Sequence, residues 1–295
     1  INHYPNIPYH CVLQMSNAVI GHQTPIVHVL ETPNQAGYAA ATFILEKAQV
    51  AISQRGRFVV SFSGGSIPAL LWYAQYLIHV CAMFISDHDY PSLNYIILYT
   101  CSPYLLESKM DFTKWWISFA DERCVPLSNP ESNFFEVNRH FLSKLPVKIP
   151  SNQIFSIMDN WLNDDTHTVA RSYEKSLRSG LSDNDDVVFD LIILGMGPDG
   201  HTASLFPGHK LLTDQSDLVA PIHDSPKPPS SRITLTLKCL NSARDVIFIA
   251  CGSSKCDVLR NVFSLDPILK SSIPAALVQP KSAVHWFIDG EANPA

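Results

Sequence analysis

Short apolar runs alternate with longer segments of helical periodicity along most of the chain. The apolar runs predict strands at 57–66, 115–123, 187–195, 232–237 and 245–252. The periodic segments predict helices at 33–54, 67–77, 128–145, 169–181 and 254–263. This alternation is typical of βαβ units and predicts an α/β fold with a mainly parallel sheet. Unbroken apolar runs suit strands with helices on both faces of the sheet, whereas 232–237 alternates and predicts a more exposed strand.

Local signals also predict where two of the helices begin. Asn129 is a candidate N-cap and Pro130 a candidate first helical residue, with apolar positions from Phe134 to Leu145 on one face. Pro68 likewise suits the first turn of the helix that follows the first predicted strand.

Four predicted strands end in glycine or charged residues. These ends are 63–66, 121–123, 195–201 and 252–255. In an open α/β sheet, ligands bind beyond the carboxyl ends of the strands. We therefore expect all four ends to meet at one cleft.

The pattern divides the chain into an N-terminal extension, residues 1–25, and one α/β domain, residues 26–295. The extension lacks the basic region and apolar core of a signal peptide. Residues 67–85 contain no Lys, Arg, Asp or Glu and reach the length of a membrane span. Gln75 and His79 interrupt this segment and no basic flank orients it, so we expect a buried helix and no membrane partner.

Composition narrows the remaining classes. The 295 residues are 46% hydrophobic and carry a net charge of −6, without a basic stripe, which argues against nucleic acid as a partner. The seven cysteines are odd in number and form no CxxC pair. We therefore expect reduced thiols and a cytoplasmic protein.

The segment "GMGPDGHTASLFPGH", residues 195–209, carries the clearest chemistry. Asp199 is placed to orient His201, and an imidazole with a pKa near 6.5 suits general-base work at neutral pH. A capping aspartate and a structural histidine are the alternative. His209 adds a second histidine, but no third ligand at metal-site spacing accompanies it, so no metal is expected.

The other strand ends offer groups for an anion. Residues 63–66, within "SFSGGS", can form a glycine-rich anion cradle or a plain turn. The stretch is neither a Walker A motif nor a nucleophile elbow. Arg232 and Lys255 can reach a phosphate, with a surface ion pair or a solvated lysine as the alternatives. Nothing local activates Cys124, which we interpret as a packing residue.

Five segments in order resemble the 6-phosphogluconolactonase family. They are "SFSGGS", "DERCVPLSNPESN", "LIILGMGPDGHTASLFPGH", "DSPKPPSSRITLTL" and "PAALVQP". The resemblance covers roughly residues 30–290 and implies a Rossmann-like fold. It implies hydrolysis of 6-phosphoglucono-δ-lactone in the second step of the oxidative pentose phosphate pathway, without metal or cofactor. The expected ligand is thus a small sugar-phosphate lactone. Fusion to, or cooperation with, glucose-6-phosphate dehydrogenase is known among such proteins and stays open here.

The resemblance also assigns roles to residues. His201 is expected to activate water as the general base, with Asp199 in support. Arg232 and Lys255 are expected at the phosphate. The expected substrate-binding residues are Ser63, Gly64, Gly65, Ser66, Asp121, Arg123, Gly197, Arg232 and Lys255.

Two other functions stay open. Hexosamine-6-phosphate isomerase/deaminases share the D-G-H motif but follow it with an acidic loop resembling F-N-E-P, where this chain has "TASLFP". A non-catalytic sugar-phosphate-binding protein is the third hypothesis, against which Asp199 and His201 count. One departure from the family is an apolar insertion expected around residues 80–104, which carries no family motif.

Overall fold

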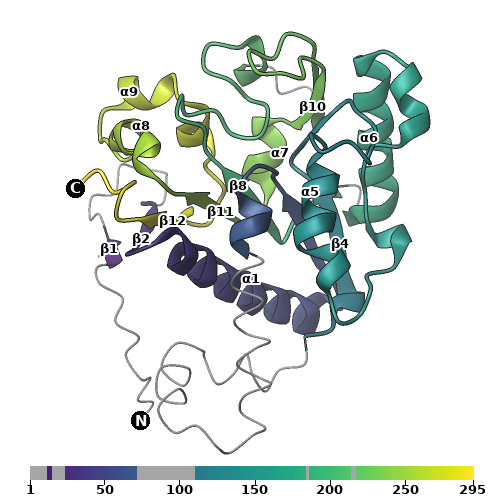
Figure 1. The fold of residues 1–295 in the computed structure, drawn as a ribbon, viewed down its shortest axis with the longest axis horizontal. Coiled ribbons are helices and arrows are strands. Elements are labelled where there is room, and N and C mark those ends of the chain that lie inside the picture. The colour runs from purple at the N-terminus through teal and green to yellow at the C-terminus, as the bar shows by residue number, and fades with distance from the viewer. Residues whose placement is uncertain (1–11, 15–23, 72–109, 184–185, 214–216) are drawn as a thin grey trace, which may run out of the picture.

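The computed structural model describes residues 12–14, 24–71, 110–183, 186–213 and 217–295 (Figure 1). The insertion expected around 80–104 lies outside the described residues. So do most of the predicted extension 1–25 and the part of 67–85 beyond residue 71. In the part of the chain that is described, no helix is both long and apolar enough to cross a membrane.

A seven-stranded sheet forms the centre of the molecule, in the order β1-β2-β12-β11-β8-β3-β4. Its strands are β1 Val12–Gln14, β2 Ile26–Leu30, β3 Phe58–Phe62, β4 Trp115–Phe119, β8 Leu191–Gly195, β11 Asp245–Ala250 and β12 His285–Asp289. All neighbours are parallel except β1, which runs antiparallel to β2. The predicted mainly parallel α/β sheet is confirmed.

The strands β2 and β12 were not predicted from the sequence pattern. Each apolar run contains a histidine, His28 in β2 and His285 in β12. The two rings face each other across the strand pair, with His28 Nε2 3.1 Å from His285 Nδ1. A polar residue that finds its partner on a distant strand cannot be recognised as interior from the local pattern.

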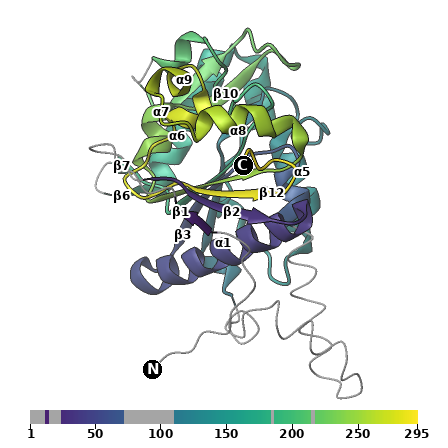
Figure 2. The ribbon, with the colours of Figure 1, turned by 90° about the vertical axis from the view of Figure 1, so that its left-hand side faces the viewer.

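Helices cover both faces of the sheet, as the apolar strands predicted. Leu191 and Ile193 of β8 pack into the core under α1 and α5, whereas Ile192 and Leu194 pack into the core under α6, α7 and α8. Figures 1 and 2 show α1 along one side of the sheet and α8 on the other. The bounds are α1 Pro33–Arg55, α5 Asn133–His140, α6 Thr166–Leu181, α7 Leu237–Ser242, α8 Cys256–Val262 and α9 Pro267–Ser271.

A second, antiparallel sheet lies beside the carboxyl edge of the first and has the order β5-β10-β9. Its strands are β5 Asp121–Arg123, β9 Val219–Ile222 and β10 Arg232–Leu235, and a two-stranded ribbon pairs β6 Ser182–Asp183 with β7 Asp186–Val187. The prediction of an exposed strand at 232–237 is wrong: every residue of β10 is buried. β10 is the central strand of its sheet, with a neighbouring strand along each edge, and α6 also packs against it.

The helix α5 starts later than predicted. Its N-cap is Ser132 and not Asn129, and Pro130 precedes the helix. The carboxylate of Glu122, in β5, accepts hydrogen bonds from the first two helical N–H groups at 2.7 and 2.8 Å. A buried acceptor on a neighbouring strand thus sets the boundary, which a local N-cap pattern could not reveal.

Candidate active site

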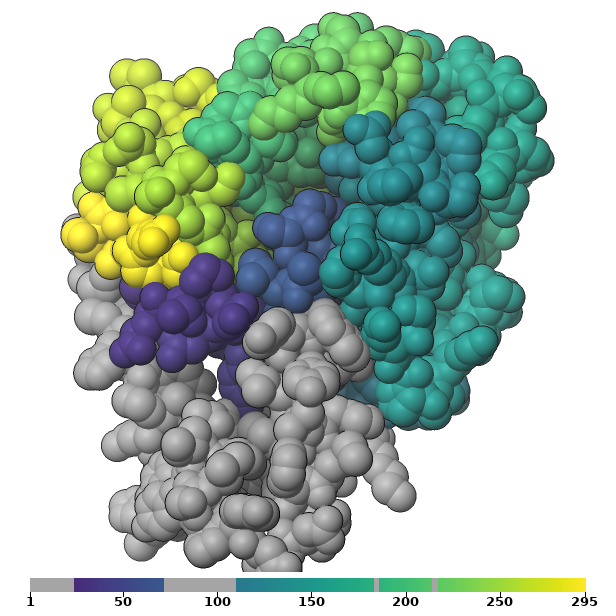
Figure 3. Space-filling view, viewed as in Figure 1, coloured from purple at the N-terminus to yellow at the C-terminus, as the bar shows by residue number. Residues whose placement is uncertain are grey.

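The predicted strand ends meet at one cavity of about 300 Å³ at the carboxyl edge of the central sheet. Figure 3 shows the blue segment that contains 63–66 at the centre of this hollowed face, between the teal and yellow-green parts. The described residues that line the cavity include Ser63, Gly64, Gly65, Ser66, Asp121, Arg123, Asn133, Gly197, His201, Arg232 and Lys255. Except for Asp199, which lies just behind His201, every residue expected at the site is on this surface.

The cradle 63–66 follows β3 and leads into helical residues 67–71. A Cβ added at Gly64 would lie 1.9 Å from Oδ1 of Asn133, so the backbone passes too close for any other residue. Asn133 in turn donates from Nδ2 to the carbonyl and a carboxylate oxygen of Asp121, at 2.8 and 3.0 Å. The hydroxyl of Ser63 is buried and has no hydrogen-bond partner among the described residues, and Ser63 lines the cavity.

A tight turn after β8 brings Asp199 and His201 together. The N–H of Gly197 donates to the carbonyl of His201 at 2.9 Å, and Gly200 has a φ of +82°. A Cβ on Gly197 would lie 2.0 Å from His201 Nδ1 and 2.5 Å from Asp199 Oδ1. The glycine at 197 therefore makes room for the His–Asp pair, in addition to lining the cavity.

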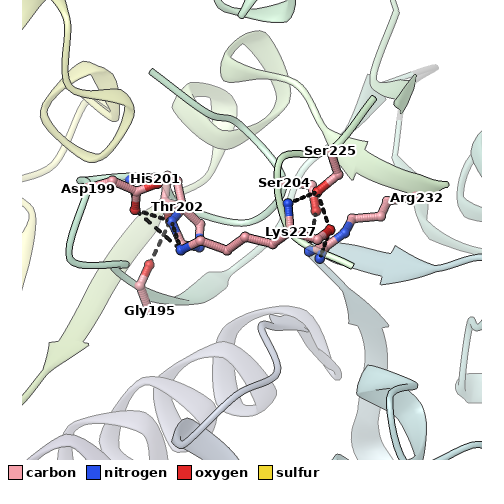
Figure 4. Close-up of polar contacts among 8 residues, drawn as sticks. All are labelled: Gly195, Asp199, His201, Thr202, Ser204, Ser225, Lys227 and Arg232. Atoms are coloured by element: carbon pink, nitrogen blue, oxygen red, sulfur yellow. Dashed lines mark hydrogen bonds and ion pairs between the residues drawn. The ribbon is translucent and has the colours of Figure 1, made fainter. Parts of the chain in front are cut away.

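His201 and Asp199 form a close Nδ1–Oδ1 contact (Figure 4). The imidazole also stacks on Phe206. Burial lowers the pKa of His201 below its usual value, and the nearby Asp199 only partly opposes this. Burial by itself would raise the pKa of Asp199, but the hydrogen bond from His201 and the charge interactions with His201 and Lys227 together outweigh it and hold that pKa below its usual range. Nδ1 is therefore engaged by a carboxylate, and Nε2 of a neutral ring is left to accept a proton.

Three cations and one carboxylate line the described cavity wall. Arg232 is 3% exposed and gives most of its donors to protein: Nε to the carbonyl of Pro229, and Nη2 to those of Lys227 and Pro228, at 2.9 to 3.0 Å. The side chain of Lys255 makes no hydrogen bond or ion pair with other described residues, and burial lowers its pKa. Lys255 is thus the cation most available to a ligand.

The other predicted cation and the carboxylate are less free. Arg123 donates to the carbonyl of Glu131, and its buried Nε has no partner in the described structure. The carboxylate of Asp121 is buried and accepts hydrogen bonds from Asn133 and from Ser204 Oγ, the latter at 2.7 Å. Asp121 therefore organises the cavity wall.

The remaining candidates lie outside this arrangement. Burial raises the pKa of Cys124 to about 11, which keeps the thiol protonated and agrees with a packing role. His209 points to Asp224 instead, with its Nε2 3.1 Å from a carboxylate oxygen. Within the described residues, no group of three or more His, Cys, Asp or Glu side chains is placed to hold a metal ion.

Lys227 belongs to the site and was missed by the sequence analysis. Its Nζ lies 3.2 Å from His201 Nδ1 and 3.5 Å from Asp199 Oδ1 (Figure 4). The available signal was a lone lysine in the proline-rich loop that precedes Arg232. A long flexible side chain reaches too far for its target to be read from its place in the sequence.

The sheet, the cationic cavity and the His–Asp pair together define a Rossmann-like α/β protein with a site for a small anionic ligand. A sequence model of the glucosamine-6-phosphate isomerases/6-phosphogluconolactonases matches residues 97–286. The chain belongs to this family.

Individual relatives agree with this assignment. The chain is 38% identical over 269 residues to a 6-phosphogluconolactonase of Rattus norvegicus, covering 90% of this chain and 92% of the relative. A solved 6-phosphogluconolactonase of Thermotoga maritima is 26% identical, with a TM-score of 0.65 over 90% of this chain and all of that one. A monomeric glucosamine-6-phosphate deaminase, 19% identical, has a TM-score of 0.64 over 90% of this chain and 98% of its own, and shares the fold alone.

Proposed function

We propose that this chain hydrolyses 6-phosphoglucono-δ-lactone to 6-phosphogluconate, with His201 as the general base. The observation that carries the proposal is His201 itself, which faces a cavity lined by three cations while its Nδ1 is held by Asp199. Relatives named 6-phosphogluconolactonase, at up to 38% identity over most of their length, support the same reaction.

The proposed reaction needs only water and one base. Nε2 of His201 takes a proton from water as the water oxygen adds to the lactone carbonyl carbon. The tetrahedral intermediate then breaks its bond to the ring oxygen, which receives the proton back from the imidazolium. The product acid releases a proton to solvent at neutral pH. A lactone is an activated ester, so a covalent nucleophile is not required.

The substrate phosphate is proposed to bind at Lys255, with the free part of the Arg232 guanidinium beside it. Charge-assisted hydrogen bonds to phosphate are the strong ones in a partly buried site. The cradle 63–66 supplies the unpartnered hydroxyl of Ser63 on the same wall.

The direct test is a turnover assay. The lactone is generated in situ from glucose 6-phosphate, and its disappearance is followed with and without the protein. Glucosamine 6-phosphate is run in parallel, with ammonia as the readout. Faster lactone loss without ammonia is expected. Ammonia release without lactone hydrolysis would make the chain a deaminase, and tight sugar-phosphate binding without either reaction would make it a binding protein.

Location and cooperation complete the proposal. We place the enzyme in the cytoplasm, where reduced thiols persist, and Cys124, Cys239, Cys251 and Cys256 are free cysteines among the described residues. Cooperation with glucose-6-phosphate dehydrogenase would bring the lactone directly to this site. Fractionation of the source cells, and co-purification of the dehydrogenase with the tagged chain, test these two points.

A further inference from the structure

Lys227 lies behind the His–Asp pair and is not among the residues that line the cavity. Its ammonium is within 3.5 Å of both His201 Nδ1 and Asp199 Oδ1. Because Nδ1 is the ring nitrogen that Asp199 engages, Lys227 approaches the side of the imidazole opposite the proposed reacting nitrogen, Nε2. This position suits a group that acts through His201 and does not suit a ligand for substrate.

The backbone of Lys227 is fixed from two directions. Its carbonyl accepts hydrogen bonds from Nη2 of Arg232 at 2.9 Å and from Oγ of Ser225 at 2.8 Å. Its own N–H donates to Oγ of Ser225 at 3.3 Å. The buried guanidinium of Arg232 therefore holds the loop that presents Lys227 to the pair (Figure 4).

Donor and acceptor roles define what Lys227 can do. An ammonium only donates, and Nδ1 cannot accept a proton while it donates its own to Asp199. In that state Lys227 donates to Asp199 Oδ1, so this one oxygen accepts from both Lys227 Nζ and His201 Nδ1. The hydrogen bond from Lys227 fixes the Asp199 carboxylate in place. The positive charge of Lys227 also disfavours protonation of the neighbouring His201 ring.

We propose that Lys227 is a positioning residue that orients Asp199 and keeps His201 neutral with Nε2 turned to the cavity. The expected effect of Lys227 on turnover rests on the proposed role of His201 as the base. Its effect on the protonation of the His201 ring does not depend on that role.

Other charged groups also face His201. Asp199, from the same turn, and Asp121, from β5, favour the protonated ring, and Lys227 opposes them. Lys255 is close enough to interact with Lys227 and Asp199, and Arg232 lies over the Phe206 ring on which His201 stacks. Lys227 is the cation in direct contact, so its removal shifts the balance toward the imidazolium.

The test measures the His201 ring directly and does not depend on turnover. The His201 signal is assigned among the imidazole resonances by its loss in His201→Gln, and its pKa is read from an NMR titration. Lys227→Met keeps most of the side-chain volume without the charge, and should raise the His201 pKa by about half a unit or more. Lys227→Arg should restore it. Lys281→Met, at an exposed lysine elsewhere, is the matched control.

Kinetics then separate the two levels of the proposal. In Lys227→Met, the acidic limb of the kcat/KM profile, which reports the free enzyme, should move up in pH with the NMR titration. KM above that limb should stay within about twofold because Lys227 is outside the cavity. A titration that does not move, or a KM that rises with an unchanged titration, overturns the role of Lys227. A titration that moves while the activity profile stays fixed supports the effect on the ring and instead removes His201 as the base.

Discussion

At the scale of single residues, the site depends on how closely a few atoms approach one another. Gly197 permits the contact between His201 and Asp199, and Gly64 permits the contact of the cradle with Asn133. Burial then lowers the pKa of His201, which keeps it available as a base into mildly acidic solution.

Replacing the base should separate proton transfer from binding. His201→Ala and His201→Asn should each lower kcat by roughly 10²- to 10⁴-fold, the usual contribution of general-base catalysis. Asp199→Asn should cost less, because it leaves the imidazole in place. The measurement is the steady-state rate of lactone loss together with a thermal melt. A His201→Ala protein that keeps most of its kcat but melts early would make His201 structural.

Gly197 offers a test that leaves the reacting groups themselves unaltered. In Gly197→Ala, the added methyl would fall within 2.0 Å of His201 Nδ1, so the ring and Asp199 must move apart. We expect a loss in kcat of about 10²-fold, because small misplacements of catalytic groups are costly. Gly290→Ala is the comparison: this turn glycine does not have a positive φ, and its Cβ would meet nothing closer than 3.8 Å. Similar kcat losses in both variants would rule out this explanation.

The phosphate site is tested with two substrates. Lys255→Ala should weaken binding of the phosphorylated lactone by about ten- to hundred-fold. This factor corresponds to the loss of a charge-assisted hydrogen bond of roughly 1.5–3 kcal/mol. Hydrolysis of unphosphorylated gluconolactone should scarcely change. Equal losses on both substrates would place Lys255 elsewhere in the reaction.

At the scale of elements, the junction of β5 with α5 joins the cavity wall to the fold. Glu122 is buried and accepts hydrogen bonds from Ser132 Oγ and from the backbone N–H groups of Arg123, Asn133 and Phe134. Burial raises its pKa to about 7, while those N–H donors act in the opposite direction. This single side chain therefore fixes both the start of α5 and the position of Asn133 against the cradle.

Removing that acceptor should destabilise the protein. Glu122→Ala leaves several buried donors unsatisfied, and we expect a loss of roughly 3 kcal/mol or more in the free energy of unfolding. Glu136→Ala removes a more exposed carboxylate from the same helix, with ion pairs to Arg139 and His140, and should cost about 0.5 kcal/mol. Urea denaturation of both variants makes the comparison. Comparable costs would show that Glu122 does not organise the junction.

At the scale of the whole molecule, the β2–β12 pair extends the parallel sheet toward the N-terminal strands and half-buries a histidine pair. Burial, with the neighbouring His285, lowers the pKa of His28 from its ordinary 6.5 to about 4. Above pH 6.5 both the folded and unfolded states carry a neutral His28. Between pH 6.5 and 4 the unfolded state binds a proton at His28 that the folded state does not. His28 therefore lowers the free energy of unfolding as the pH falls through this range.

The contribution of His28 to the pH dependence of stability is measured by comparing a His28 variant with the wild type. The comparison is needed because the raised pKa of Glu122 makes stability change with pH in the opposite direction over an overlapping pH range. His28→Phe removes the titrating group and keeps a ring to stack on Phe287. Relative to the wild type, its stability should improve by a few kcal/mol at most on going from pH 7 to pH 4. His167→Gln, at an exposed histidine, is the control. Parallel stability curves for wild type and His28→Phe would contradict the proposed linkage.

The sequence by itself determined the α/β class, the strands β3, β4, β8 and β11 of the seven-stranded sheet, and the meeting of their ends at one cavity. These follow from periodicity and from glycines after apolar runs, which are local properties of the chain. Tertiary structure decided the start of α5, the burial of β10, the strands β2 and β12, and the position of Lys227 beside His201. Each depends on a partner beyond the local pattern: Glu122 for α5, the flanking strands for β10, His285 for His28, and His201 for Lys227. Local patterns encode which element forms, whereas the environment of a polar side chain is set only when distant segments are packed together.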